Sequence, residues 1–402
     1  MNQAHDAGTG QRGNSKKSEP NHFAYIDAVR GLAFLSVLVM HSAIVTGIFP
    51  GRDVFCQGNY GVQLFFLASA ITLCHSMAER QKIDRYPVFY FYLRRLFRIA
   101  PLFWLAMVFY WTFPQVMPPL WYAEWAPAGV HPSYFALTAL FLHGWHPSVF
   151  NSIVPGGWSI AVEMNFYVFF PLIFWLLNSL KRAVIAVLFG LIYANVAVHF
   201  LLHLRLHLYP GIPDQVWAFY LVHCFLSQIV VFLIGFLAYH LLQNHFLTSL
   251  RKSRFWAGCM FSFSSLTLLC LLHGGSTGIV PIYLFIVLAL AGIILAISGG
   301  SVPGIVNPVI CYIGKISYSC YLVHFAVLYS TIRLLGVPVT MDFPLYDSGH
   351  ALTNLWFFVK VFSLTLFFTA IVSTLTLHLV ENPGIRLGKQ LIRLITARTS
   401  AR

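Results

Sequence analysis

A chain of 402 residues with 58% hydrophobic and only 9% charged residues, and with a mean hydropathy of +0.74, is not an ordinary soluble globular protein. We predict an all-α polytopic integral membrane protein with about ten transmembrane helices and a short re-entrant or surface helix. Basic loops facing anionic headgroups explain the formal net charge of +13, so this charge gives no reason to invoke nucleic acid.

The sequence divides into a polar beginning, a long apolar region and a basic end. Residues 1–22 are polar and predict a disordered cytoplasmic tail. Residues 23–385 predict one membrane domain, and residues 386–402 predict a basic cytoplasmic tail. Apolar runs of spanning length lie near 23–46, 58–78, 99–117, 158–178, 183–204, 217–242, 255–273, 279–298, 309–334 and 352–380.

An additional short apolar run, SYFALTALFLHGW at residues 133–145, decides the topology. If this run does not span, most of the 25 basic residues fall in segments on one side of the membrane. The positive-inside rule makes that side the cytoplasm. We therefore predict a re-entrant or surface-packed helix on the outer side, with both termini in the cytoplasm.

The first apolar run contains ionisable residues, which are costly at bilayer depth and usually mark a functional site. Arg30 and His41 are eleven residues apart, which at ~100° per residue is three turns plus about 20°. They therefore share one face of the predicted helix. Asp27 precedes Arg30 by three residues, close enough for the two side chains to pair.

Three arginines, Arg94, Arg95 and Arg98, directly precede the third run, at the point where a helix would enter the membrane. Their spacing lets the guanidinium groups converge on one ligand. One interpretation is a positive-inside anchor within an aromatic belt. The other is an anion clamp, because the guanidinium fork matches the geometry of a phosphate group.

The fourth run, after Gly156 and Gly157, places Ser159, Glu163 and Tyr167 four residues apart, on one face of a helix. Because this helix enters from the outside, Glu163 and His41 reach comparable depths from opposite directions. A carboxylate could then meet an imidazole, as proton transfer requires. The alternative is that Glu163 pairs with a buried cation for packing alone.

The ninth run carries Ser317, Tyr321 and His324 on one face. A buried, hydrogen-bonded histidine in a helix interface is the more common reason for such a residue. The seven cysteines show no paired spacing, so we expect neither a disulfide framework nor a cysteine-based metal site. The histidines at 199, 203 and 207 favour interfacial polarity over metal binding, and we predict no metal site.

Five segments in order, DAVRGLAFLSVLVMH, GVQLFFLASAITL, RRLFRIAPLFWL, WSIAVEMNFYVFFPLI and ISYSCYLVHF, resemble the acyltransferase-3 family of bacterial membrane O-acyltransferases. The resemblance covers about residues 22–385. It places the family's Arg-x10-His pair on Arg30 and His41, its Arg-x-x-Arg motif on Arg95 and Arg98, and its glutamate on Glu163. It implies that the membrane domain lies in the bacterial inner membrane and moves an acyl group, most often acetyl, from cytoplasmic acyl-CoA to a hydroxyl of an envelope glycan.

On this interpretation Arg95 and Arg98 hold the donor phosphates, with Arg94 assisting, and Asp27 orients Arg30 in the tunnel. His41 acts either as general base or as transient acyl carrier, and the sequence does not distinguish these two roles. Glu163 fixes the imidazole tautomer. The thioester supplies its own activation, so we expect no bound cofactor. The remaining residues that we expect to contact substrate are Ser159, Tyr167, Ser317, Tyr321 and His324.

Two other functions fit the same pattern. A multi-span transporter would also bury ionisable residues, although the sequence shows no two-half repeat and its arginine cluster suits a soluble donor. The acceptor of an acyltransferase could instead be a lipid or a small metabolite. Neither the acceptor, nor the choice among acetyl, succinyl and longer groups, nor the oligomeric state follows from the residues.

Overall fold

The computed structural model describes residues 24–118, 124–126, 129–208, 211–273, 280–300, 302 and 304–400, whose regular structure is helical. The tail predicted at residues 1–22 lies outside these ranges. The long helices are α1 (Ala24–Ile44), α3 (Gly61–Arg80), α4 (Pro87–Thr112), α7 (Gly157–Leu176), α8 (Leu180–Leu208), α10 (Phe225–Gln243), α12 (Arg254–His273), α13 (Val280–Ile297), α15 (Ser317–Leu334), α16 (Ala351–Thr376) and α17 (Asn382–Ser400). Shorter helices are α2 (Arg52–Cys56), α6 (Pro132–Ala139), α9 (Asp214–His223), α11 (His245–Lys252) and α14 (Pro308–Lys315).

The number of spanning helices differs from the prediction. Each of the ten apolar runs overlaps a helix. Within the described ranges, however, only seven helical segments are long and apolar enough to span a membrane, or eight if α14 and α15 form one span bent by 79°. Two long helices are not among the seven. Helix α4 carries three arginines, and the apolar part of α13, Tyr283–Ile297, is shorter than a membrane span requires. The predicted count of about ten is therefore not confirmed.

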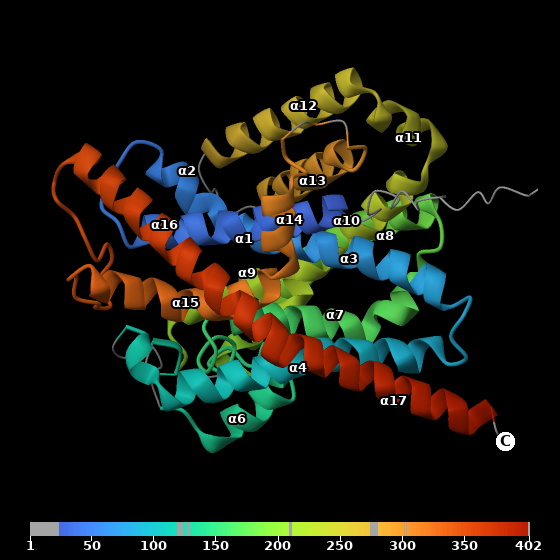
Figure 1. Ribbon diagram of the computed structural model, residues 1–402, viewed down its shortest axis with the longest axis horizontal. Helices are drawn as coiled ribbons and strands as arrows, with labels where there is room; N and C mark the ends of the chain where they lie inside the picture. The colour runs from blue at the N-terminus through green and yellow to red at the C-terminus, as the bar shows by residue number, and fades with distance from the viewer. Residues whose placement is uncertain are drawn as a thin grey trace, which may run out of the picture.

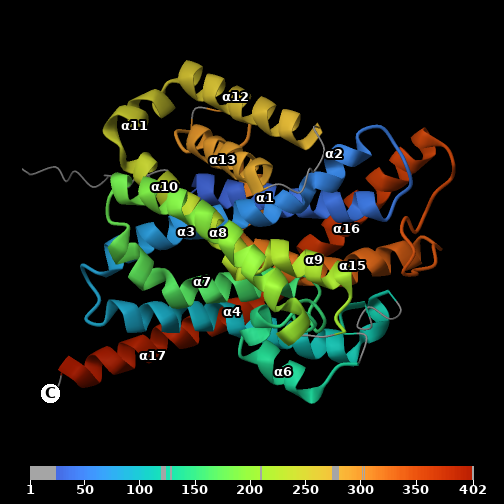
Figure 2. The same ribbon diagram turned by 180° about the vertical axis from the view of Figure 1, so that it is seen from behind.

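The helices that carry the predicted site lie in the middle of the molecule (Figures 1 and 2). In both views α1 and α3 lie between α12 and α13 above them and α7 and α4 below them. Gly31 and Gly314 let α1 and α14 approach closely, because a Cβ at Gly314 would lie 1.8 Å from the carbonyl oxygen of Asp27. Small residues at helix interfaces are the usual means of such close packing in membranes.

The segment predicted as a re-entrant or surface helix forms two short pieces, α6 and the 3-10 turn η3 (Leu142–Trp145). Neither is long enough to span, and the position of the segment relative to the bilayer stays a prediction. The chain that follows, 146–156, is non-helical and almost fully buried. Such backbone is tolerated at membrane depth where protein surrounds it and satisfies its polar groups, as where Gly156 N–H donates to Asn151 Oδ1 at 2.8 Å.

A loop covers the end of α1 that follows His41. Tyr346 pairs with Thr46 in a β-bridge, and the buried Asn354 side chain donates to the carbonyl of Ile48 at 3.0 Å and to Asp347 at 2.8 Å. Hydrogen bonds from Asn354 and from Gly349 N–H lower the pKa of Asp347 below its ordinary value. The loop therefore holds the chain that follows α1 through the Tyr346–Thr46 bridge and the Asn354 side chain, which the Asp347 carboxylate orients.

The basic segment predicted as a tail is a helix. A π-helical turn, η4 (Leu377–Glu381), joins α16 to α17, and α17 runs along α4 towards the C-terminus (Figure 1). Cβ atoms added at Gly384 and Gly388 would each meet Phe97 at 2.8 Å, so these glycines set the close contact with α4. The amphipathic pattern of α17 explains why this helix forms against the protein, since it has one face to bury and one to expose.

Candidate functional site

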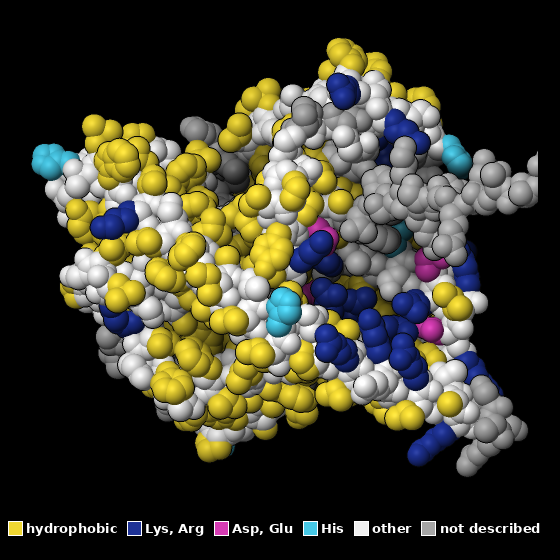
Figure 3. Space-filling view, viewed as in Figure 1, with side chains coloured by type: hydrophobic (Ala, Val, Ile, Leu, Met, Phe, Trp, Pro, Cys, Tyr) yellow, Lys and Arg dark blue, Asp and Glu magenta, His cyan; other side chains and the backbone are white. Residues whose placement is uncertain are grey.

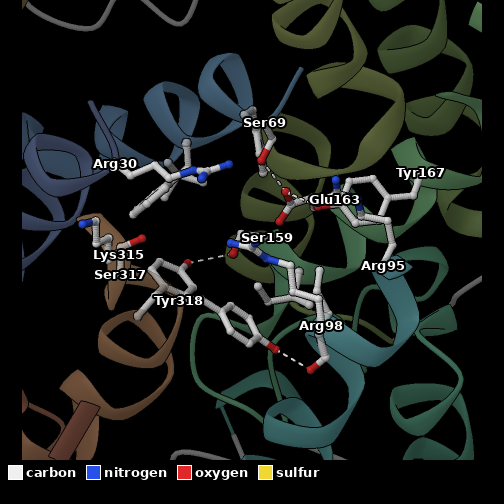
Figure 4. A pocket seen from close by; sticks show the side chains of 16 residues that line it. Arg30, Ser69, Arg95, Arg98, Ser159, Glu163, Tyr167, Lys315, Ser317 and Tyr318 are labelled. Atoms are coloured by element: carbon white, nitrogen blue, oxygen red, sulfur yellow. Dashed lines mark hydrogen bonds between the residues drawn. The ribbon is translucent and has the colours of Figure 1, made fainter. Parts of the chain in front are cut away.

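Residues from six helices line a cavity of about 70 Å³ in the centre of the bundle (Figure 4). Helices α1, α3, α4, α7, α14 and α15 each contribute at least one side chain. The charged and polar residues of the lining are Arg30, Ser69, Arg95, Arg98, Ser159, Glu163, Tyr167, Lys315, Ser317, Tyr318 and Tyr321.

The charges in this lining are unbalanced. The lining includes four cations, Arg30, Arg95, Arg98 and Lys315, and one carboxylate, Glu163. The Nε atom of Arg95 is buried and has no hydrogen-bond partner. Because uncompensated charge is costly inside a protein, a cavity of this kind favours an anionic ligand.

Glu163 is held by two hydroxyl groups. Ser69 Oγ, from α3, and Tyr167 Oη, one turn further along α7, each donate to Glu163 Oε1 at 2.5 Å. Hydrogen bonds to an ionised carboxylate are stronger than hydrogen bonds between neutral groups. Ser159, Glu163 and Tyr167 all line the cavity, as the fourfold spacing in the sequence predicts.

The three arginines of α4 do not act as one cluster. Arg95 and Arg98 line the cavity, and the Arg95 guanidinium lies over the ring of Tyr167 at 5.9 Å. Arg94 instead forms an ion pair with Asp84 at 2.5 Å and is absent from the lining. Two of the three arginines predicted to converge therefore face the cavity, and the third is engaged by a loop carboxylate.

Arg30 lies on α1 at the cavity, but its partner is not the predicted one. Its Nη2 donates to Thr72 Oγ1 of α3 at 3.3 Å. Asp27 takes part in none of the ion pairs formed by the described residues. The predicted close ion pair between Asp27 and Arg30 is not confirmed, because α3 packs beside α1 and offers Arg30 a hydroxyl acceptor.

His41 lies next to a second histidine rather than next to Glu163. Its ring centroid is 5.3 Å from that of His324 and 4.4 Å from that of Phe325. No hydrogen bond of the described residues joins His41 to Glu163, whose Oε1 accepts from Ser69 and Tyr167. The sequence placed both residues in the interior but could not show that another helix, α15, stands beside His41.

His324 is fully buried, and only one of its two ring nitrogens has a hydrogen-bond partner. Nδ1 donates to the carbonyl of Tyr321 at 2.7 Å, whereas Nε2 has no partner. A ring nitrogen that donates to a carbonyl leaves the other nitrogen with a free lone pair in the neutral imidazole. In this tautomer Nε2 of His324 can accept a proton or a hydrogen bond beside the imidazole of His41.

A hydroxyl pair connects this region with the cavity. Ser159 Oγ and Tyr321 Oη lie 2.9 Å apart, and both lie within hydrogen-bond distance of the Gly156 carbonyl, at 3.0 and 3.2 Å. Tyr321 also contacts the ring of His324, with centroids 5.6 Å apart. Ser317 lines the cavity at the start of α15, so the predicted polar stripe on this helix faces the site.

Sequence reasoning missed several residues of the site. Ser69, Lys315 and Tyr318 line the cavity, and Glu381 is buried at the π-helical turn, where Ser319 donates to it. A serine or lysine in an amphipathic or apolar run does not by itself indicate a functional site. Glu381, in contrast, directly follows an apolar run of spanning length, and a carboxylate at that place does indicate one. Within the described ranges no group of three or more His, Cys, Asp and Glu side chains could hold a metal ion.

An all-helical fold with candidate membrane spans around a cavity lined mainly by cationic charged side chains is that of an integral membrane protein. A family model described as an acyltransferase domain matches residues 23–374, nearly the whole chain. The chain therefore belongs to the acyltransferase-3 family and is a membrane acyltransferase. No curated protein and no solved structure matches it.

Proposed function

We propose that this acyltransferase moves an acyl group, acetyl in the simplest case, from cytoplasmic acyl-CoA to a hydroxyl group of an envelope or exported glycan. It does so as a multi-pass protein of the bacterial inner membrane with both termini in the cytoplasm. The observation that carries the proposal is the charge imbalance of the cavity, where four cations face one carboxylate. An anionic donor would supply the missing negative charge.

The donor enters from the cytoplasmic end of α4. Arg95 and Arg98 bind its anionic part, and Arg30 and Lys315 extend the same positive field along the cavity. Water-poor surroundings strengthen these contacts relative to the same contacts in solution. The thioester arm then points along α1 towards His41, about 16 Å beyond Arg30 by the rise of a helix.

The transfer step needs one base and no cofactor. As a general base, His41 takes the proton of the acceptor hydroxyl while the oxygen attacks the thioester carbonyl. The carbon–sulfur bond breaks, the thiolate takes the proton from the imidazolium, and the products are an ester and free coenzyme A. As an acyl carrier, His41 attacks the thioester carbonyl and expels the thiolate; the acceptor hydroxyl then takes the acyl group from the imidazole, and its proton goes to the thiolate.

Glu163 has a supporting role in this mechanism. Its bonds from Ser69 and Tyr167 fix a single negative charge among the cations, which orients them towards the donor. His324, with an unpartnered Nε2 beside His41, binds the acceptor hydroxyl or receives its proton. Ser159, Tyr321 and Ser317 line the path between the two regions.

The donor site is tested by binding of acetyl-CoA to the purified protein. Replacing both Arg95 and Arg98 by glutamine should weaken binding more than a hundredfold, because hydrogen bonds to charged groups contribute about 1.5–3 kcal/mol each. The matched control, Lys82→Gln/Arg94→Gln, removes the same charge from residues that pair with Glu79 and Asp84. Equal affinities of the two double variants would show that the donor binds elsewhere.

A further inference from the structure

The exposed face of α17 carries a basic stripe. Arg386, Lys389 and Arg393 are spaced by three and four residues and are all exposed, so they share one side of the helix. None of them takes part in the ion pairs of the described residues. This helix lies outside residues 23–374, the part that matches the family.

Two contacts fix where along α4 this stripe lies. Gly384 and Gly388 pack against Phe97, and Thr396 Oγ1 lies 2.9 Å from Tyr90 Oη. The two helices therefore run antiparallel, and the basic stripe lies alongside the half of α4 that carries Arg95 and Arg98. Figure 3 shows Lys and Arg side chains gathered in one group over this part of the surface.

The small volume of the cavity favours a donor site that extends beyond it. A cavity of about 70 Å³ has room for a few water molecules and is small for a nucleotide. If the donor is acyl-CoA, only its thioester arm fits inside, and the phosphorylated nucleotide must lie at the mouth. Helix α17 packs along α4, the helix that brings Arg95 and Arg98 to the cavity.

The other exposed stripe of α17 has a different character. Leu387, Leu391 and Leu394 are exposed, and they lie about a third of a turn away from the basic stripe. The leucines suit contact with lipid chains, and the basic stripe lies on the other exposed side of the helix.

We propose that Arg386, Lys389 and Arg393 bind the phosphate groups of the donor nucleotide at the mouth of the cavity. This inference rests on the proposed use of acyl-CoA. Arginine and lysine side chains on one helix face provide several donors for phosphate oxygens. The donor is thus held by its nucleotide on α17 and α4 and by its arm within the cavity.

The test compares two triple variants in nanodiscs of neutral phosphatidylcholine. Arg386→Gln/Lys389→Gln/Arg393→Gln should weaken binding of acetyl-CoA at least about tenfold and leave binding of S-acetyl-pantetheine, which lacks the nucleotide, unchanged. Lys181→Gln/Arg182→Gln/Arg254→Gln removes the same charge from residues remote from α17 in the sequence and should leave both affinities unchanged. Thermal unfolding of both variants checks that each is folded.

Three results would overturn the inference. Equal acetyl-CoA affinities of the two triple variants would show that α17 does not contact the nucleotide and would leave the proposed function intact. A difference seen only in discs containing anionic phosphatidylglycerol would assign the stripe to lipid headgroups. Absence of acetyl-CoA binding by the unmodified protein would reject both this inference and the proposed function.

Discussion

Glu163 is the one carboxylate among four cations in the cavity lining, and its position depends on two hydroxyl donors. Ser69 and Tyr167 both donate to the same oxygen at 2.5 Å. Tyr167 is one helical turn from Glu163, so the sequence could predict that contact. Ser69 comes from α3, and no local pattern could show which helix packs there.

Replacing Glu163 by glutamine removes the negative charge but keeps the size of the side chain. We expect the ligand-free variant to be less stable by about 1–3 kcal/mol, because both hydroxyl donors lose a charged acceptor and the cations repel one another. Coenzyme A should restore much of this stability, since its phosphates replace the missing charge. Thermal unfolding in detergent with and without coenzyme A measures both effects. A variant as stable as the unmodified protein would contradict this view of Glu163.

At the scale of helices, each apolar segment predicted from the sequence overlaps a helix, but the predicted boundaries differ from those of the structure. Helix α4 begins at Pro87, well before the predicted run at 99–117, because Arg95 and Arg98 face the cavity and Arg94 pairs with Asp84. The bend between α14 and α15 follows Lys315, where Ile316 leaves the helical path. Hydropathy averaged over a window detects neither feature.

The close contact between α1 and α14 provides a test of the helix packing. A Cβ at Gly314 would lie 1.8 Å from the backbone oxygen of Asp27, so Gly314→Ala should force the helices apart and destabilise the protein by about 1–3 kcal/mol. Gly258, in α12, has open space around its Cβ position. The control Gly258→Ala should therefore be neutral or stabilising by up to about 1 kcal/mol. Equal unfolding temperatures for the two variants would mean that α1 and α14 are not packed in this way.

At the scale of the whole molecule, the sequence predicted the membrane class and that the ionisable residues of the site face the protein interior. Most of the predicted site residues line one cavity, namely Arg30, Arg95, Arg98, Ser159, Glu163, Tyr167, Ser317 and Tyr321. The pairing of His41 with His324 joins helices that are far apart in the chain, and spacing within one helix cannot predict such a contact. The helical form of residues 382–400 was also missed, because its amphipathic sequence resembles a polar tail.

The predicted orientation can be tested with single cysteines. In a background without the exposed Cys259 and Cys270, a cysteine replacing Glu124 should react with an impermeant maleimide added outside intact cells. A cysteine replacing Lys181 should react only after the membrane is opened, because basic loops face the cytoplasm. The reverse pattern would invert the topology and move the donor site to the outer side.

The central claim is that His41 performs the transfer, and ester formation by cells carrying a His41→Gln variant tests it most directly. Glutamine keeps much of the size of histidine but cannot accept a proton at neutral pH or carry an acyl group. Base-labile esters on envelope glycans, quantified by NMR, should fall at least about a hundredfold relative to the unmodified protein, since general base catalysis contributes about 10²–10⁴-fold. Acetyl-CoA binding by the purified variant should be retained, because Arg95 and Arg98 are unchanged. Ester levels equal to those of cells with the unmodified protein, from a folded variant present in the same amount, would contradict the account.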